Sequence, residues 1–202
     1  MRKTALLFLV SLLLIGCSAV KTPVSNQYKL TAYSQQQFAK SPIQRSILVT
    51  LPEAVAGYQT EEMLYMKKPF ELTAFANNAW VDQPANMLFP LIVQSIQRSG
   101  YFYAVASSPH AELTDYRLDT QLIELQQNFL KNPSVISLVV KVVLTDMRDN
   151  HVIASRLISE HICSPSASPY GGVVAANRAA ELFTAETTRF VIAEARKNTH
   201  SK

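Results

Sequence analysis

Three long segments in the second half of the chain alternate apolar and polar residues. They cover residues 112–125, 133–147 and 152–162, and a turn at Asp149-Asn150 separates the last two. A period of two places successive side chains on opposite faces of a strand. Because the connections are short, the pattern predicts that the three strands pair in sequence order as an antiparallel meander.

The first half carries shorter apolar segments that are typical of strands. They cover residues 28–32, 46–51, 63–66, 70–75 and 101–105. Pro52 ends the second of them, since proline cannot donate a hydrogen bond to a sheet. Only Lys67-Lys68-Pro69 separates the third from the fourth. These two segments therefore predict a β-hairpin.

Two segments repeat apolar residues at the spacing of an α-helix. Residues 84–99 form the first, with Asp82 expected as the N-cap ahead of Pro84. Residues 172–197 form the second, which is amphipathic along its length. The elements together predict an α+β fold, in which an antiparallel sheet with long meander strands has two principal helices packed on one face.

The N-terminus carries two basic residues and then an apolar run over residues 5–15. This run is shorter than the roughly 20 apolar residues that span a bilayer, and it matches a secretory signal. It ends in Leu14-Ile15-Gly16-Cys17, which resembles the bacterial lipobox. We therefore expect cleavage after Gly16 and acylation of Cys17. An ordinary signal that is cleaved elsewhere is the alternative.

Acylation of Cys17 would determine where the domain lies. Several acyl chains anchor a protein stably to a membrane, whereas a single chain holds it only marginally. Ser18 rather than Asp follows the cysteine, which resembles an address for the outer membrane. We expect a chain held by outer-membrane lipid in the inner leaflet and facing the periplasm. The predicted parts are a signal peptide over residues 1–16, the acylated cysteine and a tether over 17–26, and a single domain over 27–197.

Charge and glycine content exclude two classes of function. The 19 Lys+Arg and 15 Asp+Glu give a formal charge of +4. Removal of the signal peptide would also remove Arg2 and Lys3, so the formal charge of the mature chain would be +2. So small a charge predicts no nucleic-acid partner. The five glycines form neither of the phosphate-binding patterns GxGxxG and GxxxxGK[ST]. Any nucleotide-driven step therefore has to reside in another chain.

Residues that could carry catalysis or bind a metal do not form a recognisable set. Asp146, Asp149 and His151 lie close in sequence, and His161 precedes Cys163 by two residues. Each group supplies fewer than the three or four ligands that zinc requires, and the sequence contains neither HExxH nor GxSxG. We therefore predict no catalytic residue, no metal and no cofactor. Cys163 has no partner within the chain once the other cysteine is acylated, and we expect it to be buried. A disulfide bridge to another chain is the alternative.

The most individual pattern lies between residues 62 and 102. Its segments are Glu62-Met-Leu-Tyr-Met66, Pro69-Phe-Glu-Leu-Thr-Ala-Phe-Ala-Asn-Asn-Ala-Trp80, Pro84-Ala-Asn-Met-Leu88 and Ser99-Gly-Tyr-Phe102. The series resembles the ABC-type transport auxiliary lipoprotein family over roughly residues 28–193. The sequence departs from the family pattern where Ala79 stands for the usual Arg and Gln83 for the first Pro.

The resemblance implies a non-catalytic lipoprotein that is an auxiliary, docking component of a transport system. The implied partners are an MCE-domain protein with its ABC permease and ATPase, which move lipids or other hydrophobic molecules between the inner and outer membranes. Two alternatives stay open. A stand-alone periplasmic lipid carrier would need a deep apolar cavity, and an envelope hydrolase would need a nucleophile beside a base.

A row of valines on the predicted strand 133–147 is a candidate partner interface. Val135, Val139 and Val143 point away from the expected core, and exposed apolar rows mark protein interfaces. Either the MCE partner or a second copy of this chain could cover them. Alternatively, the loop of residues 34–44 folds over the row. Tyr65 and Trp80 join the candidate interface, with core packing as the alternative for Trp80.

Overall fold

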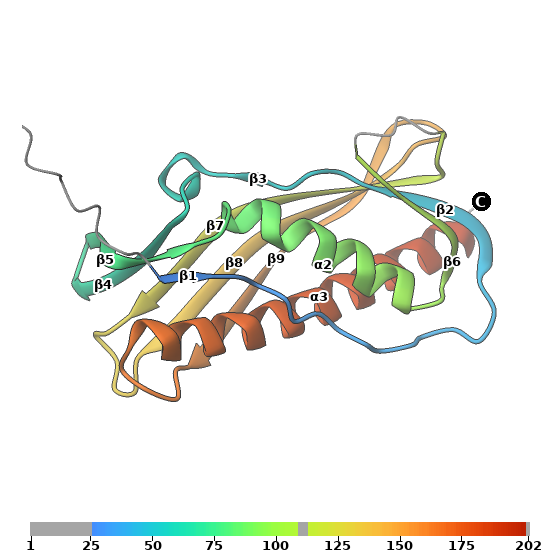
Figure 1. Ribbon diagram of the computed structural model, residues 1–202. Helices are drawn as coiled ribbons and strands as arrows, with labels where there is room; N and C mark the ends of the chain where they lie inside the picture. The colour runs from blue at the N-terminus through green and yellow to red at the C-terminus, as the bar shows by residue number, and fades with distance from the viewer. Residues whose placement is uncertain (1–25, 109–112, 201–202) are drawn as a thin grey trace, which may run out of the picture.

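The computed structural model describes residues 26–108 and 113–200, with side chains described as far as residue 198 within the last helix. Gly16 and Cys17, on which the predicted cleavage and acylation fall, lie outside this part of the chain. The described residues form one mixed sheet of nine strands with two α-helices on one face (Figure 1). The predicted α+β class and the two helices are confirmed.

The elements follow the sequence periodicity closely where the chain is regular. The strands are β1 (Asn26–Tyr28), β2 (Ile43–Val49), β3 (Glu53–Ala54), β4 (Glu62–Lys68), β5 (Glu71–Trp80), β6 (Phe102–Ser107), β7 (Tyr116–Asn128), β8 (Val135–Asp146) and β9 (His151–Cys163). The helices are α2 (Pro84–Arg98), α3 (Pro169–His200) and the short 3-10 helix η1 (Ala56–Tyr58). The β4–β5 hairpin and the antiparallel meander β7–β8–β9 are confirmed.

The prediction of an antiparallel sheet is wrong for the rest of the strands. β7 pairs antiparallel with β8 on one edge, but on its other edge it pairs parallel with β2, β3 and β4 in turn. The segment from Ile47 to Met66 thus runs beside β7, with Ile47 opposite Tyr116 and Met66 opposite Asn128. Parallel pairs also join β1 to β5 and β2 to β6. Such pairs need long crossovers, here supplied by α2 and by the length of the chain between the strands.

The first predicted strand, residues 28–32, is also largely wrong. Of this segment only Tyr28 belongs to a strand, as the last residue of β1, and the chain after it crosses the helices and does not pair with the sheet. The Thr31 amide donates to Asn177 Oδ1 at 2.8 Å, and the Ser34 amide donates to Thr184 Oγ1 at 3.0 Å. Polar side chains on α3 therefore satisfy the backbone of this segment in place of a neighbouring strand.

The core lies between the helices and the facing side of β7 and β8. Its fully buried side chains alternate along the strands, and α3 brings small residues and Phe183 against them. The main strand residues are Tyr116, Leu118, Leu122, Leu138, Val142 and Leu144. Ser95 on α2 donates to the carbonyl of Thr184 at 3.1 Å, so the two helices are also joined by a buried hydrogen bond. The expected N-cap is displaced by one residue, because Gln83 occupies the N-cap position of α2 without a side-chain capping bond. Asp82 Oδ1 instead accepts a hydrogen bond from the Gln83 amide at 2.7 Å.

The turn between β4 and β5 holds Phe70 in a backbone conformation that suits few residues. Its φ is 66°, in the left-handed region, and its side chain is fully exposed. A non-glycine residue there costs about 1–2 kcal/mol, although asparagine tolerates the region well. No packing in the described structure offsets this cost.

We predict that Phe70→Asn raises the free energy of unfolding by about 0.5–1 kcal/mol, because Asn relieves the backbone strain and no buried contact is lost. Urea denaturation monitored by circular dichroism would measure the change. A lower stability of the variant would show that the Phe70 ring packs against the domain in solution.

Candidate functional site

The face of the sheet opposite the helices is open, and we call it the open face. Its position follows from strand alternation, because every second residue of β7, β8 and β9 points away from α3. Cross-strand pairing groups these side chains in rows: Val139 lies between Glu124 and Ser159, and Lys141 between Gln121 and Leu157. The open face therefore mixes apolar and charged residues.

The predicted valine row is only partly available on the open face. Val135 is buried, whereas Val139 and Val143 are partly exposed. The alternative that residues 34–44 cover the row is wrong, because this loop lies over the helices and the Phe38 amide donates to the Ser99 carbonyl at 2.9 Å. Within the described structure, Val139 and Val143 thus keep surface that a partner could cover.

A groove of about 430 Å³ and the neighbouring strand β9 each add to the open face one exposed leucine that the sequence did not single out. The groove is lined by Thr50, Leu51, Glu53, Asp119, Thr120, Gln121, Lys141 and Val143. Leu51 is 51% exposed, and Leu157, which pairs with Lys141 on the neighbouring strand, is 59% exposed. The alternation of β9 could have identified Leu157. Leu51 could not be identified, because its place beside β7 depends on the parallel pairing.

Tyr65 and Trp80 do not join the valines on the open face. Tyr65 pairs with Gln127, whose side-chain amide donates to the Ser168 carbonyl at the start of α3. Tyr65 therefore lies on the helix-covered side, where its ring centroid is 4.4 Å from that of Phe75. Trp80 is 3% exposed and belongs to the hydrophobic core, in agreement with the packing alternative.

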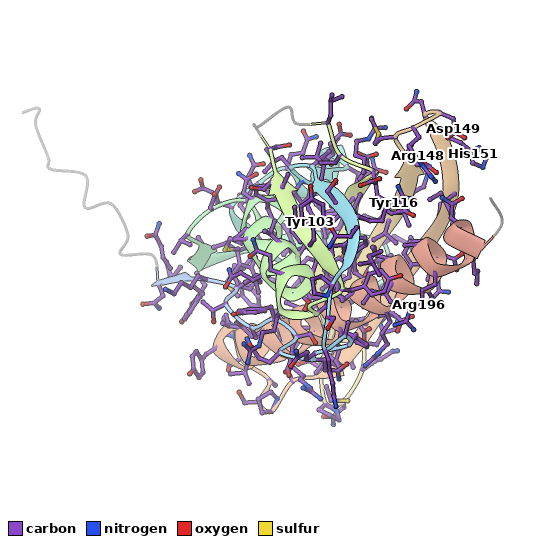
Figure 2. All side chains as sticks on the ribbon, turned by 90° about the vertical axis from the view of Figure 1, so that its right-hand side faces the viewer. Tyr103, Tyr116, Arg148, Asp149, His151 and Arg196 are labelled. Carbon is purple, nitrogen blue, oxygen red and sulfur yellow. The ribbon has the colours of Figure 1, made fainter. Side chains whose placement is uncertain are left out.

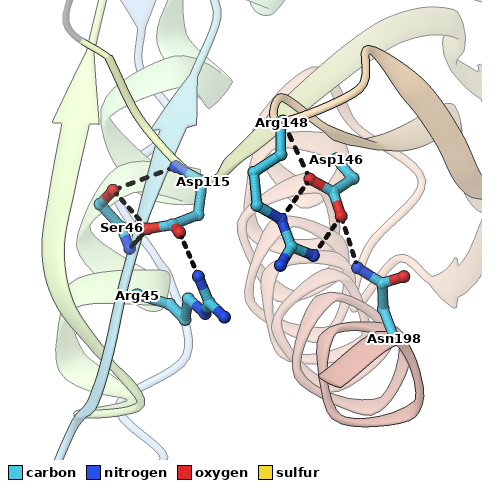
Figure 3. Close-up of polar contacts among 6 residues, drawn as sticks. All are labelled: Arg45, Ser46, Asp115, Asp146, Arg148 and Asn198. Atoms are coloured by element: carbon cyan, nitrogen blue, oxygen red, sulfur yellow. Dashed lines mark hydrogen bonds and ion pairs between the residues drawn. The ribbon is translucent and has the colours of Figure 1, made fainter. Parts of the chain in front are cut away.

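Two aspartates hold the ends of the central strands in place (Figure 3). Asp146, at the end of β8, accepts hydrogen bonds from Arg148 Nε at 2.9 Å and from Asn198 Nδ2 at 2.8 Å. Arg148 Nη2 forms a further ion pair with the same carboxylate. The bond from Asn198 ties the end of α3 to the sheet.

Asp115, just before β7, fixes the start of β2 to the central strands in the same way. It accepts hydrogen bonds from Arg45 Nη1 at 2.7 Å and from the Ser46 amide at 2.9 Å. Burial acts to raise the pKa of Asp115, but the bonds from Ser46 and Arg45 outweigh it and lower the pKa. For Asp146 the bond from Arg148 is the largest effect, and it holds the pKa far below its usual range.

A second groove lies at the same end of the domain, which Figure 2 views directly. Its volume is about 590 Å³, and Arg45, Arg196 and Tyr101 line it. Arg45 is paired with Asp115, and the Arg196 guanidinium lies 5.2 Å from the centre of the Tyr101 ring. Both guanidinium groups therefore have contacts that stabilise the fold.

The described residues contain little that could carry a reaction. Ser137 Oγ and His161 Nδ1 are 3.1 Å apart on the open face, but no carboxylate among the described residues is hydrogen-bonded to His161. Within the same part of the chain, no three His, Cys, Asp or Glu side chains gather as a metal site, and no helix is long and apolar enough to cross a membrane. The predicted burial of Cys163 is wrong, because its side chain is exposed.

Comparison with solved structures identifies the fold. Protein XCC0632 from Xanthomonas campestris, a protein of the family DUF330, superposes with a TM-score of 0.78 over 87% of this chain and 99% of its own. The two proteins share a fold. Their sequence identity is 19%. DUF330 corresponds to the ABC-type transport auxiliary lipoprotein family, so the resemblance inferred from the sequence is confirmed at the level of the fold.

Further comparisons add less. An uncharacterized protein of known structure superposes with a TM-score of 0.66 at 11% identity, over 83% of this chain and 99% of its own. The PelC dodecamer from Paraburkholderia phytofirmans reaches a TM-score of only 0.42 at 10% identity, over 75% of this chain and 89% of its own. That similarity is too low to carry an argument. No family model and no curated protein matches the sequence.

We predict that Asp146→Asn lowers the free energy of unfolding by about 2 kcal/mol, because it weakens charge-assisted hydrogen bonds to a buried group. Asp119→Asn is the matched control. Its carboxylate pairs with Arg117 at 2.9 Å and accepts a hydrogen bond from Thr50 Oγ1 at 3.0 Å, but it is 38% exposed, so the loss is expected to be about 0.5 kcal/mol. Urea denaturation at neutral pH would measure both, and equal losses would contradict the role assigned to Asp146.

The same carboxylates predict an acid-sensitive stability. The folded-state pKa values of Asp115 and Asp146 are lowered, so their contribution is fully present above the unfolded value of about 3.9 and is lost as the pH falls through the folded values. Denaturation curves between about pH 6 and pH 2 should show this loss. Asp146→Asn should flatten the curve below about pH 4, and an unchanged slope would contradict the linkage.

Proposed function

We propose that this chain is a lipid-anchored periplasmic protein that docks an MCE-type ABC transport system at the outer membrane. The observation that carries the proposal is the fold shared with a DUF330 protein along nearly the full length of both chains. A shared fold does not determine function by itself. The lipobox-like sequence ending in Cys17 supports the proposal independently, since it is typical of proteins held on a membrane by acyl chains.

The open face and the neighbouring edge of β9 offer the docking surface. Among the described strands β9 pairs only with β8, so the other edge of a 13-residue strand lacks a strand partner. Unpaired strand edges readily accept another strand. Leu157 lies on β9 itself, and Val139 and Val143 lie on the neighbouring strand β8. Lys141 and Glu124 add charged side chains next to them. An apolar centre within a polar rim is the usual composition of a protein interface.

The packing of the core beside Trp80 supports docking over carriage of a lipid at that place in the described structure. A carrier needs an enclosed apolar cavity of several hundred Å³. The free volume in the core beside Trp80 is about 10 Å³, which is no more than the space of one water molecule. The grooves described above lie at the surface and are lined by charged as well as apolar residues.

Acylation can be tested directly on Cys17. We predict that the intact mass of the membrane-derived chain corresponds to a polypeptide that begins at Cys17 and carries acyl groups. Cys17→Ala should remove the protein from the outer-membrane fraction, because each buried methylene of an acyl chain contributes about 0.8 kcal/mol to anchoring. An unmodified Cys17 in membrane-derived protein would contradict the lipid anchor.

Docking can be tested by co-purification of the full chain with the MCE-domain protein. We predict that Leu157→Asp weakens the complex roughly 10-fold. The variant loses the apolar area of Leu157 that binding would bury and places an aspartate in the contact, which together reduce the binding free energy by more than about 1.4 kcal/mol. Val139→Asp should act in the same direction. Val174→Asp is the matched control, because Val174 is 43% exposed on α3, across the domain from the open face.

The outcomes separate the parts of the proposal. If the unmodified chain does not bind the MCE-domain protein, the transport role is wrong. If it binds and Leu157→Asp binds equally well, the contact lies elsewhere on the domain. Sedimentation of the purified chain tests whether a second copy covers the open face. If it does, Leu157→Asp lowers the mass of the sedimenting species toward that of the monomer while the thermal midpoint of unfolding stays nearly constant.

A further inference from the structure

The turns at one end of the sheet expose apolar side chains that the fold does not use. The β4–β5 turn and the β7–β8 loop meet there because Met66 pairs with Asn128 shortly before both turns (Figure 1). Phe70 and Leu130 line a shared groove of about 460 Å³. We call Pro69, Phe70, Leu72 and Leu130 the hairpin tip.

The hairpin tip is strongly apolar for a solvent-exposed turn. Phe70 is fully exposed, and Leu72 and Leu130 are 43% and 48% exposed. Turns ordinarily carry small or polar residues, and the left-handed φ of Phe70 favours Gly or Asn. Neither packing nor backbone geometry therefore accounts for an aromatic residue at this position. An apolar surrounding outside the domain would account for it.

Basic residues surround the hairpin tip. Lys67, Lys68 and Lys131 are exposed, and Glu71 is the acidic residue next to them, paired with Lys68 at 3.3 Å. Lys67 Nζ lies 5.2 Å from the centre of the Tyr65 ring, which holds its charge beside the turn. Apolar side chains within a ring of lysines match the interface of a membrane that contains anionic phospholipid.

The position of β1 relates the hairpin tip to the lipid anchor. β1 runs parallel to β5 with Asn26 opposite Asn78, so Asn26 is the end of β1 nearer to the start of β5 at Glu71. The seven residues from Glu71 to Asn78 span roughly 23 Å. The nine residues from Cys17 to Asn26 reach at most about 30 Å. A membrane that holds Cys17 can therefore touch the hairpin tip.

We infer that the hairpin tip contacts the phospholipid surface to which the acylated Cys17 is anchored. Phe70 and Leu130 enter the interfacial layer, and Lys67, Lys68 and Lys131 meet the phosphate groups. The inference rests on the lipid anchor of the proposed function. It also defines the orientation of the anchored domain. The end of the sheet that carries the hairpin tip contacts the membrane, and the open face lies to the side, where other proteins on the membrane can reach it.

Fluorescence of Phe70→Trp in the acylated full chain tests the contact. The protein would be reconstituted into vesicles of three parts phosphatidylethanolamine to one part phosphatidylglycerol, with and without brominated acyl chains. We expect a blue-shifted emission that brominated lipid reduces by at least half. Trp80 is buried, and the signal of the unmodified chain is subtracted.

Tyr103→Trp is the matched control, because Tyr103 is 59% exposed at the other end of the domain (Figure 2). Its emission should not respond to brominated lipid. An acylated chain whose Phe70→Trp emission is equally unaffected would overturn the contact while leaving the anchor intact. A response to added MCE-domain protein instead of lipid would also overturn it and identify a protein as the occupant. An unacylated chain would contradict the anchor itself, which intact mass establishes beforehand.

Discussion

The fold depends on the pairing of β7 along both of its edges. Its 13 residues hold β8 on one side and the successive strands β2, β3 and β4 on the other. Because the side chains of a strand alternate between faces, this pairing sets which residues of every neighbouring strand face α3 and which lie on the open face. Tyr65 illustrates the effect, since its pairing with Gln127 places it on the helix-covered side.

Local periodicity predicted those elements whose contacts are local. The meander and the hairpin consist of antiparallel neighbours with short turns, and α2 and α3 carry their apolar residues at helical spacing. The parallel pairs join residues far apart, such as Ile47 and Tyr116, and β3 has only two residues. Periodicity contains no information on such partners. For the same reason the sequence indicated Val139 and Val143 but not Leu51, whose exposure depends on how the chain lies beside β7.

The two ends of the sheet are held by different forces, and this fits their proposed roles. At the start of β7, Asp115 and Asp146 fix β2 and α3 by charge-assisted hydrogen bonds, which require exact placement of both partners. At the other end, Tyr65, Phe75 and Phe129 stack behind the turns, with ring centroids 4.4 to 6.2 Å apart. Aromatic packing tolerates small displacements better than directed hydrogen bonds do. Within the described residues, the rings at the end proposed to meet lipid thus pack without a buried ion pair like that of Asp146, and its charged groups, Lys67, Lys68, Glu71 and Lys131, lie at the exposed surface.

Phe70 and Trp80 show how the fold separates structural from functional aromatic residues. Both belong to the β4–β5 hairpin segment, and both have large apolar surfaces. Trp80 is buried, so the fold accounts for it and its presence carries no further inference. Phe70 is exposed and strained at the backbone, so its presence lowers the stability of the isolated domain. A residue that the folded chain alone does not require has to be explained by something outside it, and the adjacent lysines and the reach of the tether make lipid the occupant with the strongest physical support.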